Sequence, residues 1–181
     1  MKYLYLLLFT SLLYHSCKYQ NEVPSNFNFI INDGANDSYN SEKGLFYRES
    51  LIESKFYDDD SILTKGYIID KKEYSIKLKE NDYKRVYKLY KSINFQSFPS
   101  KFEIEWDNPE IIITSPSFES SLEIYENNNC KKVIADIPNI NNPIKDRKQS
   151  IKYLELYDLI WEIIKEKEEY KITPKSNMVY F

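Results

Sequence analysis

The stretch EYSIKLKENDYKRVYKLYKSINF, residues 73–95, changes its hydrophobic period halfway along. In residues 73–80 apolar and polar side chains alternate, which predicts a β-strand with one buried face. Residues 83–93 repeat apolar side chains at helical spacing, and Asn81 or Asp82 can cap that helix. A one-faced strand followed directly by a helix indicates an antiparallel sheet whose other side is covered by helices. The alternating apolar residues are Tyr74, Ile76 and Leu78.

Three further strands are predicted before this stretch. They cover residues 26–32, 44–54 and 62–70. Polar residues and glycine in NDGANDS, residues 32–38, predict a turn after the first of them. The acidic run YDDDS, residues 57–61, predicts the break between the second and the third.

The second half of the chain follows the same plan. Alternation and turn residues predict four strands, and the last helix is expected over residues 150–169, with Ser150 as its cap. The predicted strands are residues 101–106, 110–114, 121–126 and 131–137. The apolar stripe of the helix is Tyr153, Leu156, Tyr157, Ile160, Ile163 and Ile164. The expected fold is therefore α+β, a curved antiparallel sheet of about six to seven strands with two helices on one face.

The first residues have the pattern of an export signal. Lys2 is followed by an apolar run over residues 3–13, which is the order of charged and apolar regions in a secretory signal peptide. The run is shorter than the ~20 apolar residues that a membrane-spanning helix needs.

The segment LLYHSC, residues 12–17, then resembles the lipobox of bacterial lipoproteins, and the looser versions found in the Bacteroidota in particular. Leu12, Leu13, Ser16 and Cys17 match that motif in kind, whereas Tyr14, at the usual leucine position, and His15 depart from it. The resemblance implies that residues 1–16 are removed, that Cys17 carries lipid, and that residues 17–25 form a short tether to one domain, residues 26–181. It implies a place in the cell envelope, where the outer membrane, at its periplasmic face or surface, is favoured over the inner membrane. An uncleaved anchor and a coincidental cysteine are the alternatives.

Removal of the signal would exclude several chemistries. His15 is the only histidine, so the mature domain would lack histidine catalysis and histidine-ligated metal sites. Cys130 would have no disulfide partner, and we expect it to be structural, although neighbouring lysines could lower its pKa slightly. The three glycines form no phosphate-binding motif, and the net charge of −3 gives no basic surface for nucleic acid. We expect no cofactor, no metal, no nucleotide and no nucleic-acid partner.

Two charged segments are candidate partner-binding sites. One is the acidic run Asp58, Asp59 and Asp60, for which a solvated turn is the simpler interpretation and a divalent cation site the less favoured one. The other is Lys145, Arg147 and Lys148, in a polar loop directly before the last helix. Positive charge there opposes the helix dipole, so stability does not explain it, yet an ordinary surface loop explains it as well.

The remaining features divide between packing and binding. Aromatic residues make up 16% of the chain, and most fall at core positions of the predicted elements. Met178, Val179, Tyr180 and Phe181 form an apolar end that should dock on the domain or on another chain. The leading hypothesis is a non-catalytic, lipid-anchored envelope protein that binds a protein partner. An immunity lipoprotein that neutralises an envelope-delivered toxin is the alternative. A carboxylate-dependent hydrolase is third, because Glu103 and Glu105 share one face of a predicted strand.

Overall fold

A computed structural model describes residues 22–59, 62–105, 118–137 and 144–178, with the backbone alone for residues 52–59 and 62–68. Six strands form one antiparallel sheet in the order β4-β3-β2-β1-β5-β6. The strands are β1 (Asn28–Asn32), β2 (Asp37–Asn40), β3 (Leu45–Asp59), β4 (Ile62–Ser75), β5 (Glu119–Glu126) and β6 (Asn129–Asp136). The helices are α2 (Glu80–Ser92), the 3-10 turn η1 (Phe95–Ser97), α3 (Arg147–Lys165) and α4 (Glu168–Lys171).

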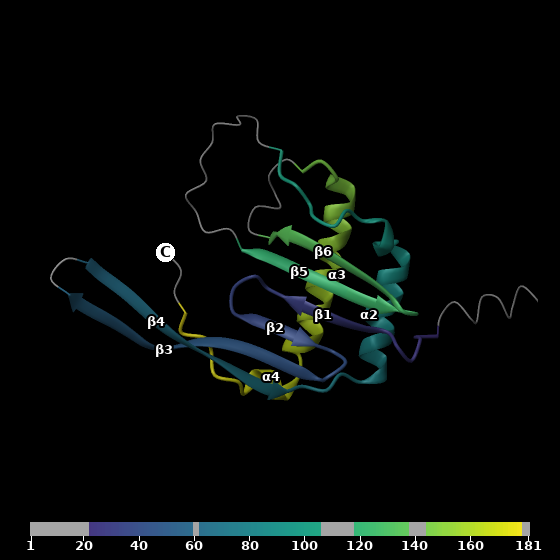
Figure 1. Cartoon of the computed structure of the whole chain (residues 1–181). Helices are drawn as coiled ribbons and strands as arrows, with labels where there is room; N and C mark the ends of the chain where they lie inside the picture. Colours follow the sequence, from purple (N-terminus) through teal and green to yellow (C-terminus); the bar gives the residue numbers. More distant parts are fainter. Residues whose placement is uncertain (1–21, 60–61, 106–117, 138–143, 179–181) are drawn as a thin grey trace, which may run out of the picture.

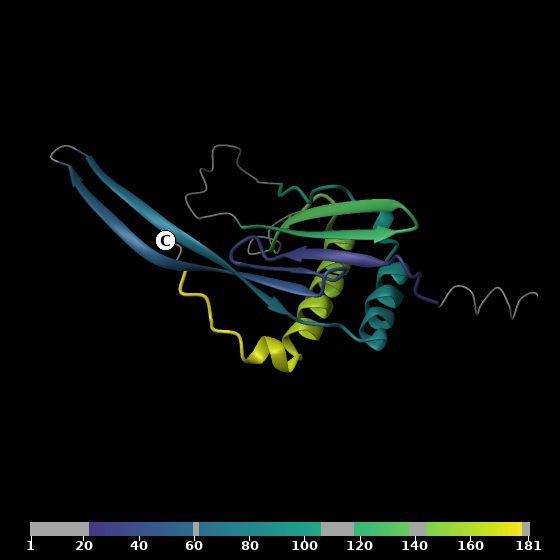
Figure 2. The same cartoon turned by 60° about the horizontal axis from the view of Figure 1, so that its bottom comes forward.

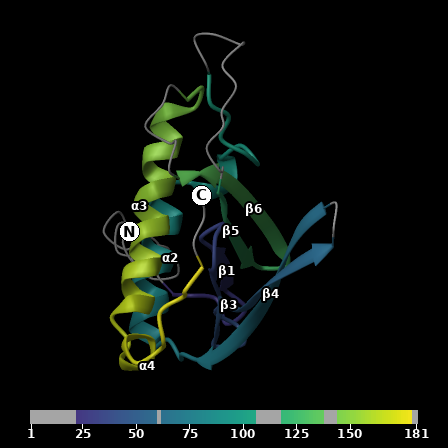
Figure 3. The same cartoon turned by 90° about the vertical axis from the view of Figure 1, so that its left-hand side faces the viewer.

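Helices α2 and α3 lie side by side on one face of the curved sheet (Figure 1, Figure 3). The predicted α+β class and sheet type are therefore confirmed. The core lies between the sheet and the two helices. Phe27, Phe29 and Ile31, which alternate along the first strand region, are buried there. All six residues of the predicted stripe on α3 are buried as well. Burial of a large apolar side chain contributes about 1.5–3 kcal/mol, so this layer holds most of the stabilising free energy.

Several predicted boundaries are wrong. The alternating segment 73–80 is not a separate strand, because β4 ends at Ser75 and α2 begins at Glu80. Ile76 is nevertheless fully buried, since the hydroxyl of Tyr39 donates to its carbonyl oxygen at 2.9 Å and holds the connection over the core. The turn predicted at 32–38 contains the start of β2, which antiparallel pairing with β1 and β3 orders.

The predicted strand at 101–106 is also wrong over its described part. Residues 101–105 make only single bridges, Lys101 to Ile134 and Ile104 to Ile144. Glu103 and Glu105, proposed as paired acids, thus share no strand face and are exposed. The strand predicted at 110–114 lies outside the described residues.

The helix starts differ from the predicted caps. Helix α2 is capped at Lys79, whose backbone N–H donates to Asp82 at 2.7 Å, so Asp82 acts from the third helical position. Helix α3 begins at Arg147, three residues before Ser150, which lies buried in its first turn. The last helical segment is divided, because α3 ends at Lys165 and α4 follows as a separate turn.

Strands β3 and β4 are much longer than the strands beside them. They span 15 and 14 residues, whereas β2 has 4 residues and pairs with β3 only as far as Arg48. Beyond Arg48 the two strands continue as a two-stranded ribbon that projects from the body (Figure 1, Figure 2). We call residues 49–59 and 62–71 the arm. Its tip lies at the opposite end of the molecule from the segment with which the described chain begins, coloured purple (Figure 2).

Candidate functional site

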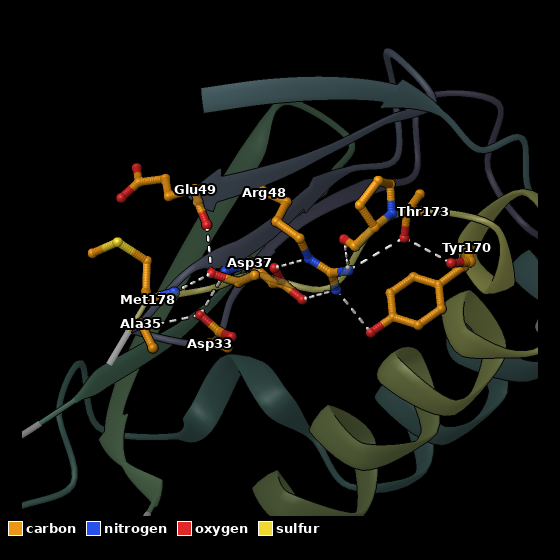
Figure 4. Close-up of polar contacts among 10 residues, drawn as sticks. Asp33, Ala35, Asp37, Arg48, Glu49, Tyr170, Thr173 and Met178 are labelled. Carbon is orange, nitrogen blue, oxygen red and sulfur yellow. Dashed lines mark hydrogen bonds and ion pairs between the residues drawn. The ribbon is translucent and has the colours of Figure 1, made fainter. Parts of the chain in front are cut away.

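Arg48 joins three parts of the molecule at the base of the arm (Figure 4). It comes from β3 and forms a bidentate ion pair with Asp37 of β2, with contacts of 2.8 Å and 2.5 Å. Its remaining N–H groups donate to the hydroxyl of Tyr170 at 3.1 Å, to the carbonyl oxygen of Pro174 at 2.8 Å and to the hydroxyl of Thr173 at 3.3 Å. We call these five residues the Arg48 cluster.

The Arg48 cluster has a structural role: it holds the C-terminal segment on the sheet. Arg48 is only 7% exposed, and five hydrogen bonds match the five N–H donors of its guanidinium group. The hydrogen bonds that Arg48 donates to Asp37 raise the pKa of Arg48 above its usual value, against the opposing effect of burial. The guanidinium carbon also lies 5.0 Å from the ring of Phe46 and 5.3 Å from that of Tyr170. No donor is left for a ligand, so the cluster attaches the C-terminal segment to the sheet.

Two cavities flank this cluster, and Asp37, Lys165 and Tyr170 line both of them. The first has a volume of about 390 Å³ and a largely acidic lining. The second, of about 430 Å³, is largely basic. Both volumes lie within the range of small-ligand sites. The other lining residues of the first are Asp33, Tyr157, Asp158, Trp161 and Glu162, and the basic ones of the second are Arg48, Lys171 and Lys175.

Two carboxyl groups of the acidic cavity have raised pKa values. Burial raises the pKa of Asp33, although the backbone N–H groups of Asp37 and Ala35 donate to it at 2.9 Å and 2.8 Å. Burial also raises the pKa of Asp158, and the neighbouring Glu162 adds to this effect. Raised carboxyl pKa values in a cavity suit a general acid. Yet Asp33 already stabilises a turn, and Asp37 is already paired with Arg48. Within the described residues no group of side chains is arranged to bind a metal ion.

The two sequence-predicted charged segments lie in different parts of the molecule. Asp58 and Asp59 are the last residues of β3, at the tip of the arm, and so belong to a strand; Asp60 lies outside the described residues. Lys145 precedes α3, and Arg147 and Lys148 are exposed in its first turn. The structure therefore does not bring the acidic and the basic candidates together.

Cys17 lies outside the described residues. Among the helices that the structure describes, none has the length and apolar character needed to cross a membrane. Cys130 is exposed in β6, and its pKa is raised by partial burial and by the hydrogen bond to Glu123, which outweigh the effect of Lys132. The expected lowering of that pKa is thus wrong. Met178, at the start of the apolar end, donates its N–H to Ser176, whereas residues 179–181 are outside the description.

Glu126 is a buried acid that sequence reasoning missed. Its carboxylate accepts hydrogen bonds from the hydroxyls of Tyr87 at 2.7 Å and Tyr90 at 2.8 Å, and from Lys91 at 3.3 Å. Burial alone would raise its pKa, but these donors outweigh burial and lower it. The sequence contained the signal, because Glu126 lies in phase with the buried residues Leu122 and Ile124 of β5.

Glu126 should make folding stability sensitive to acid. Because its folded-state pKa is lowered, its contribution is complete above the unfolded pKa, near 4.5, and is lost as the pH falls through the folded pKa. In Glu126→Gln the free energy of unfolding should therefore fall less steeply below about pH 4.5 than in the wild type. Urea titrations at several pH values measure this, and Glu73→Gln, which changes an exposed carboxylate, is the control. Equal slopes in the wild type and Glu126→Gln would contradict the assignment.

Comparison with known proteins gives no relative from which a role could be taken. No protein-family model, no curated protein and no solved structure matches the chain. What the protein does must therefore be inferred from its own residues and their arrangement.

Proposed function

We propose that this protein is a non-catalytic, lipid-anchored protein of the cell envelope that binds another protein through its arm. The observation that carries the proposal is the arm itself, which projects from the end of the domain opposite to the segment with which the described chain begins (Figure 2). Lipid on Cys17 would attach the chain to a membrane. The tether of residues 18–25 would span at most about 27 Å.

The arm is not explained by the needs of the core. An isolated two-stranded ribbon is marginally stable in water at best, and the sheet's pairing with β2 ends at Arg48. A projecting ribbon also leaves strand edges unpaired, which is a liability unless another chain uses them. Strand edges are a common site at which proteins bind extended segments of other proteins. An element that adds little to the fold and reaches away from the attachment point supports a binding role.

Charge suggests the kind of partner. Asp58 and Asp59 end β3 at the tip, and Asp60 follows them in the sequence; this acidic run would favour a partner with a basic surface, by steering and by opposite charge. The immunity alternative would use the same tip against a basic toxin. Lys145, Arg147 and Lys148 offer a second surface, on a different part of the molecule.

The carboxyl groups of the acidic cavity are poorly arranged for a hydrolase. With Asp33 and Asp37 engaged in the fold, the acids left for catalysis are Asp158 and Glu162, four residues apart on α3. Residues at that spacing lie on the same face of a helix, whereas glycoside hydrolysis needs carboxyl groups on opposite sides of the bond. Binding therefore fits the geometry better.

The test is crosslinking of the natively expressed full chain in its membranes. We expect a heterologous adduct that is lost in Asp58→Asn/Asp59→Asn/Asp60→Asn and retained in the matched variant Lys145→Gln/Arg147→Gln/Lys148→Gln. Cys17→Ala should release the protein from the membrane fraction, and intact mass should show acyl chains on the wild type only. An unlipidated wild type, or an adduct indifferent to the tip, would contradict the proposal.

A further inference from the structure

The acidic cavity is formed mainly by one face of α3. Tyr157, Trp161 and Lys165 follow one another at intervals of four residues on that helix, so their side chains form one continuous wall. The rings of Tyr157 and Trp161 meet edge to face, with centroids 6.4 Å apart and planes at 71°. Asp158 and Glu162 also line the cavity, and both are exposed. The cavity therefore combines aromatic rings with accessible carboxylates.

An ammonium group of the chain itself already occupies this wall. The Nζ atom of Lys165 lies 5.9 Å from the centroid of the Trp161 ring, within the range of a cation–π contact. Burial and Glu162 raise the pKa of Asp158, and the positive charge of Lys165 opposes them. The side chain of Lys165 is exposed, so it can leave the ring without breaking the core. The cavity thus shows which chemical group it accommodates, because Lys165 places an ammonium group there.

The negative charge of the cavity is larger than Lys165 can balance. Outside the Arg48 cluster the lining acids are Asp33, Asp158 and Glu162. In the described ranges of the chain, none of the three forms an ion pair. Lys165 is the only other charged residue that lines the described cavity. A second cation would therefore be attracted to it.

Trp161 supplies an independent sign of a missing partner. The residue is only 6% exposed, and its indole N–H has no hydrogen-bond partner in the part of the chain that the structure describes. The hydroxyl of Tyr157 does not accept from it, but donates to the carbonyl oxygen of Asn32 at 3.4 Å. Buried polar groups are nearly always hydrogen-bonded. An unpaired donor in the wall of a cavity indicates an acceptor that comes from outside.

We propose that the acidic cavity binds the side chain of a lysine from outside this chain, either free lysine or a lysine residue of a peptide. Its ammonium group would replace that of Lys165 over the Trp161 ring, beside Asp158 and Glu162. The cavity, of about 390 Å³, has room for the aliphatic stem, which can lie along the aromatic wall. The carbonyl or carboxylate group of the ligand provides an acceptor for the indole N–H. This inference goes beyond the proposed function, because the site lies on α3 and not on the arm.

The experiment is an NMR titration of the ¹⁵N-labelled full chain in a non-ionic detergent. The chain has two tryptophans, so the indole N–H signal that remains in Trp106→Phe belongs to Trp161. The probes are free lysine, Nα-acetyl-lysine N-methylamide and, as the uncharged control, Nα-acetyl-norleucine N-methylamide. We expect a saturable shift of the Trp161 signal with at least one lysine compound, at a Kd of about a millimolar. The lysine compound that binds more tightly identifies the source of the ligand.

Two sets of substitutions should move the affinity in opposite directions. Asp158→Asn/Glu162→Gln removes the two accessible negative charges and should raise the Kd about tenfold. Glu155→Gln is the matched control, because Glu155 is exposed on α3 but does not line the cavity, and it should leave the Kd unchanged. Lys165→Gln removes the competing ammonium group and should lower the Kd about threefold. A purely structural role of Lys165 would not give tighter binding.

Four results would overturn the proposal. They are the absence of a saturable shift with both lysine compounds, equal binding of the norleucine compound, an unchanged Kd in Asp158→Asn/Glu162→Gln, and a Kd that is not lowered in Lys165→Gln. None of them bears on the proposed function, because the crosslinked adduct is tested by substitutions at the tip of the arm.

Discussion

Arg48→Ala is expected to lower the free energy of unfolding by about 3–5 kcal/mol. The substitution leaves the carboxylate of Asp37 without its ion pair, in a place where its side chain is only 14% exposed. A charge left in such surroundings is costly because water cannot replace the lost partner. The same change frees the C-terminal segment, since Arg48 holds both Pro174 and Thr173.

Urea denaturation followed by far-UV circular dichroism measures this loss. Lys72→Ala is the matched control, because Lys72 lies directly across from Arg48 in β4. Its side chain is 58% exposed, and its ammonium group is 3.9 Å from the carboxylate of Asp70. Exposed ion pairs contribute about 0–1 kcal/mol, so the control should be nearly neutral. If Arg48→Ala lowered the free energy of unfolding no more than the control does, the structural role of the Arg48 cluster would be contradicted.

Gly34→Ala is expected to destabilise the protein by about 2–5 kcal/mol. Gly34 has a φ of +81°, a conformation that side chains disfavour. A Cβ there would also meet backbone, at 2.8 Å from the carbonyl carbon of Glu119 and 2.9 Å from that of Phe118. This backbone cannot move aside easily, because β5 begins at Glu119 and pairs with β1.

Gly44→Ala is the control for this prediction. Gly44 also has a positive φ, +63°, but its nearest neighbours would be 3.4 Å away at Ile76 and 3.5 Å away at Lys77, an ordinary contact distance. Gly44→Ala should lower the free energy of unfolding by only about 1 kcal/mol, the cost of placing a side chain at a positive φ. Equal losses for the two variants, in the same urea titration, would mean that crowding against β5 is absent.

The predictable parts of the fold are those in which one periodic face meets the core. The stripe on α3 predicts burial correctly because helical spacing alone puts those residues on one side. The segment 73–80 shows the limit of this reasoning. Ile76 is buried, as alternation predicts, but in a connection that crosses the core rather than in a strand. Strand β2 has too few residues for a periodic signal, and its conformation comes from the neighbours on both sides.

The Arg48 cluster had no signal in the sequence. Asp37 lies in a segment with the composition of a turn, and its hydrogen-bonded network reaches Tyr170 and Thr173, more than a hundred positions away along the chain. No local pattern links residues at that separation. The register shift between Leu51 and Glu53 likewise had no signal in the sequence, because it is a property of the pairing between β3 and β4.

The distance along the chain between these contacts also affects how the domain forms. The hydrogen bond between Arg48 and Pro174 and the one between Leu51 and Asn177 each join residues that are 126 positions apart in the chain. Non-local closures slow folding because the entropy of the loop is lost before the contact forms. A chain that emerges from its N-terminus onward therefore cannot complete the base of the arm until residue 177 has been synthesised. We expect the base of the arm to be completed only after residue 177 has been released for folding.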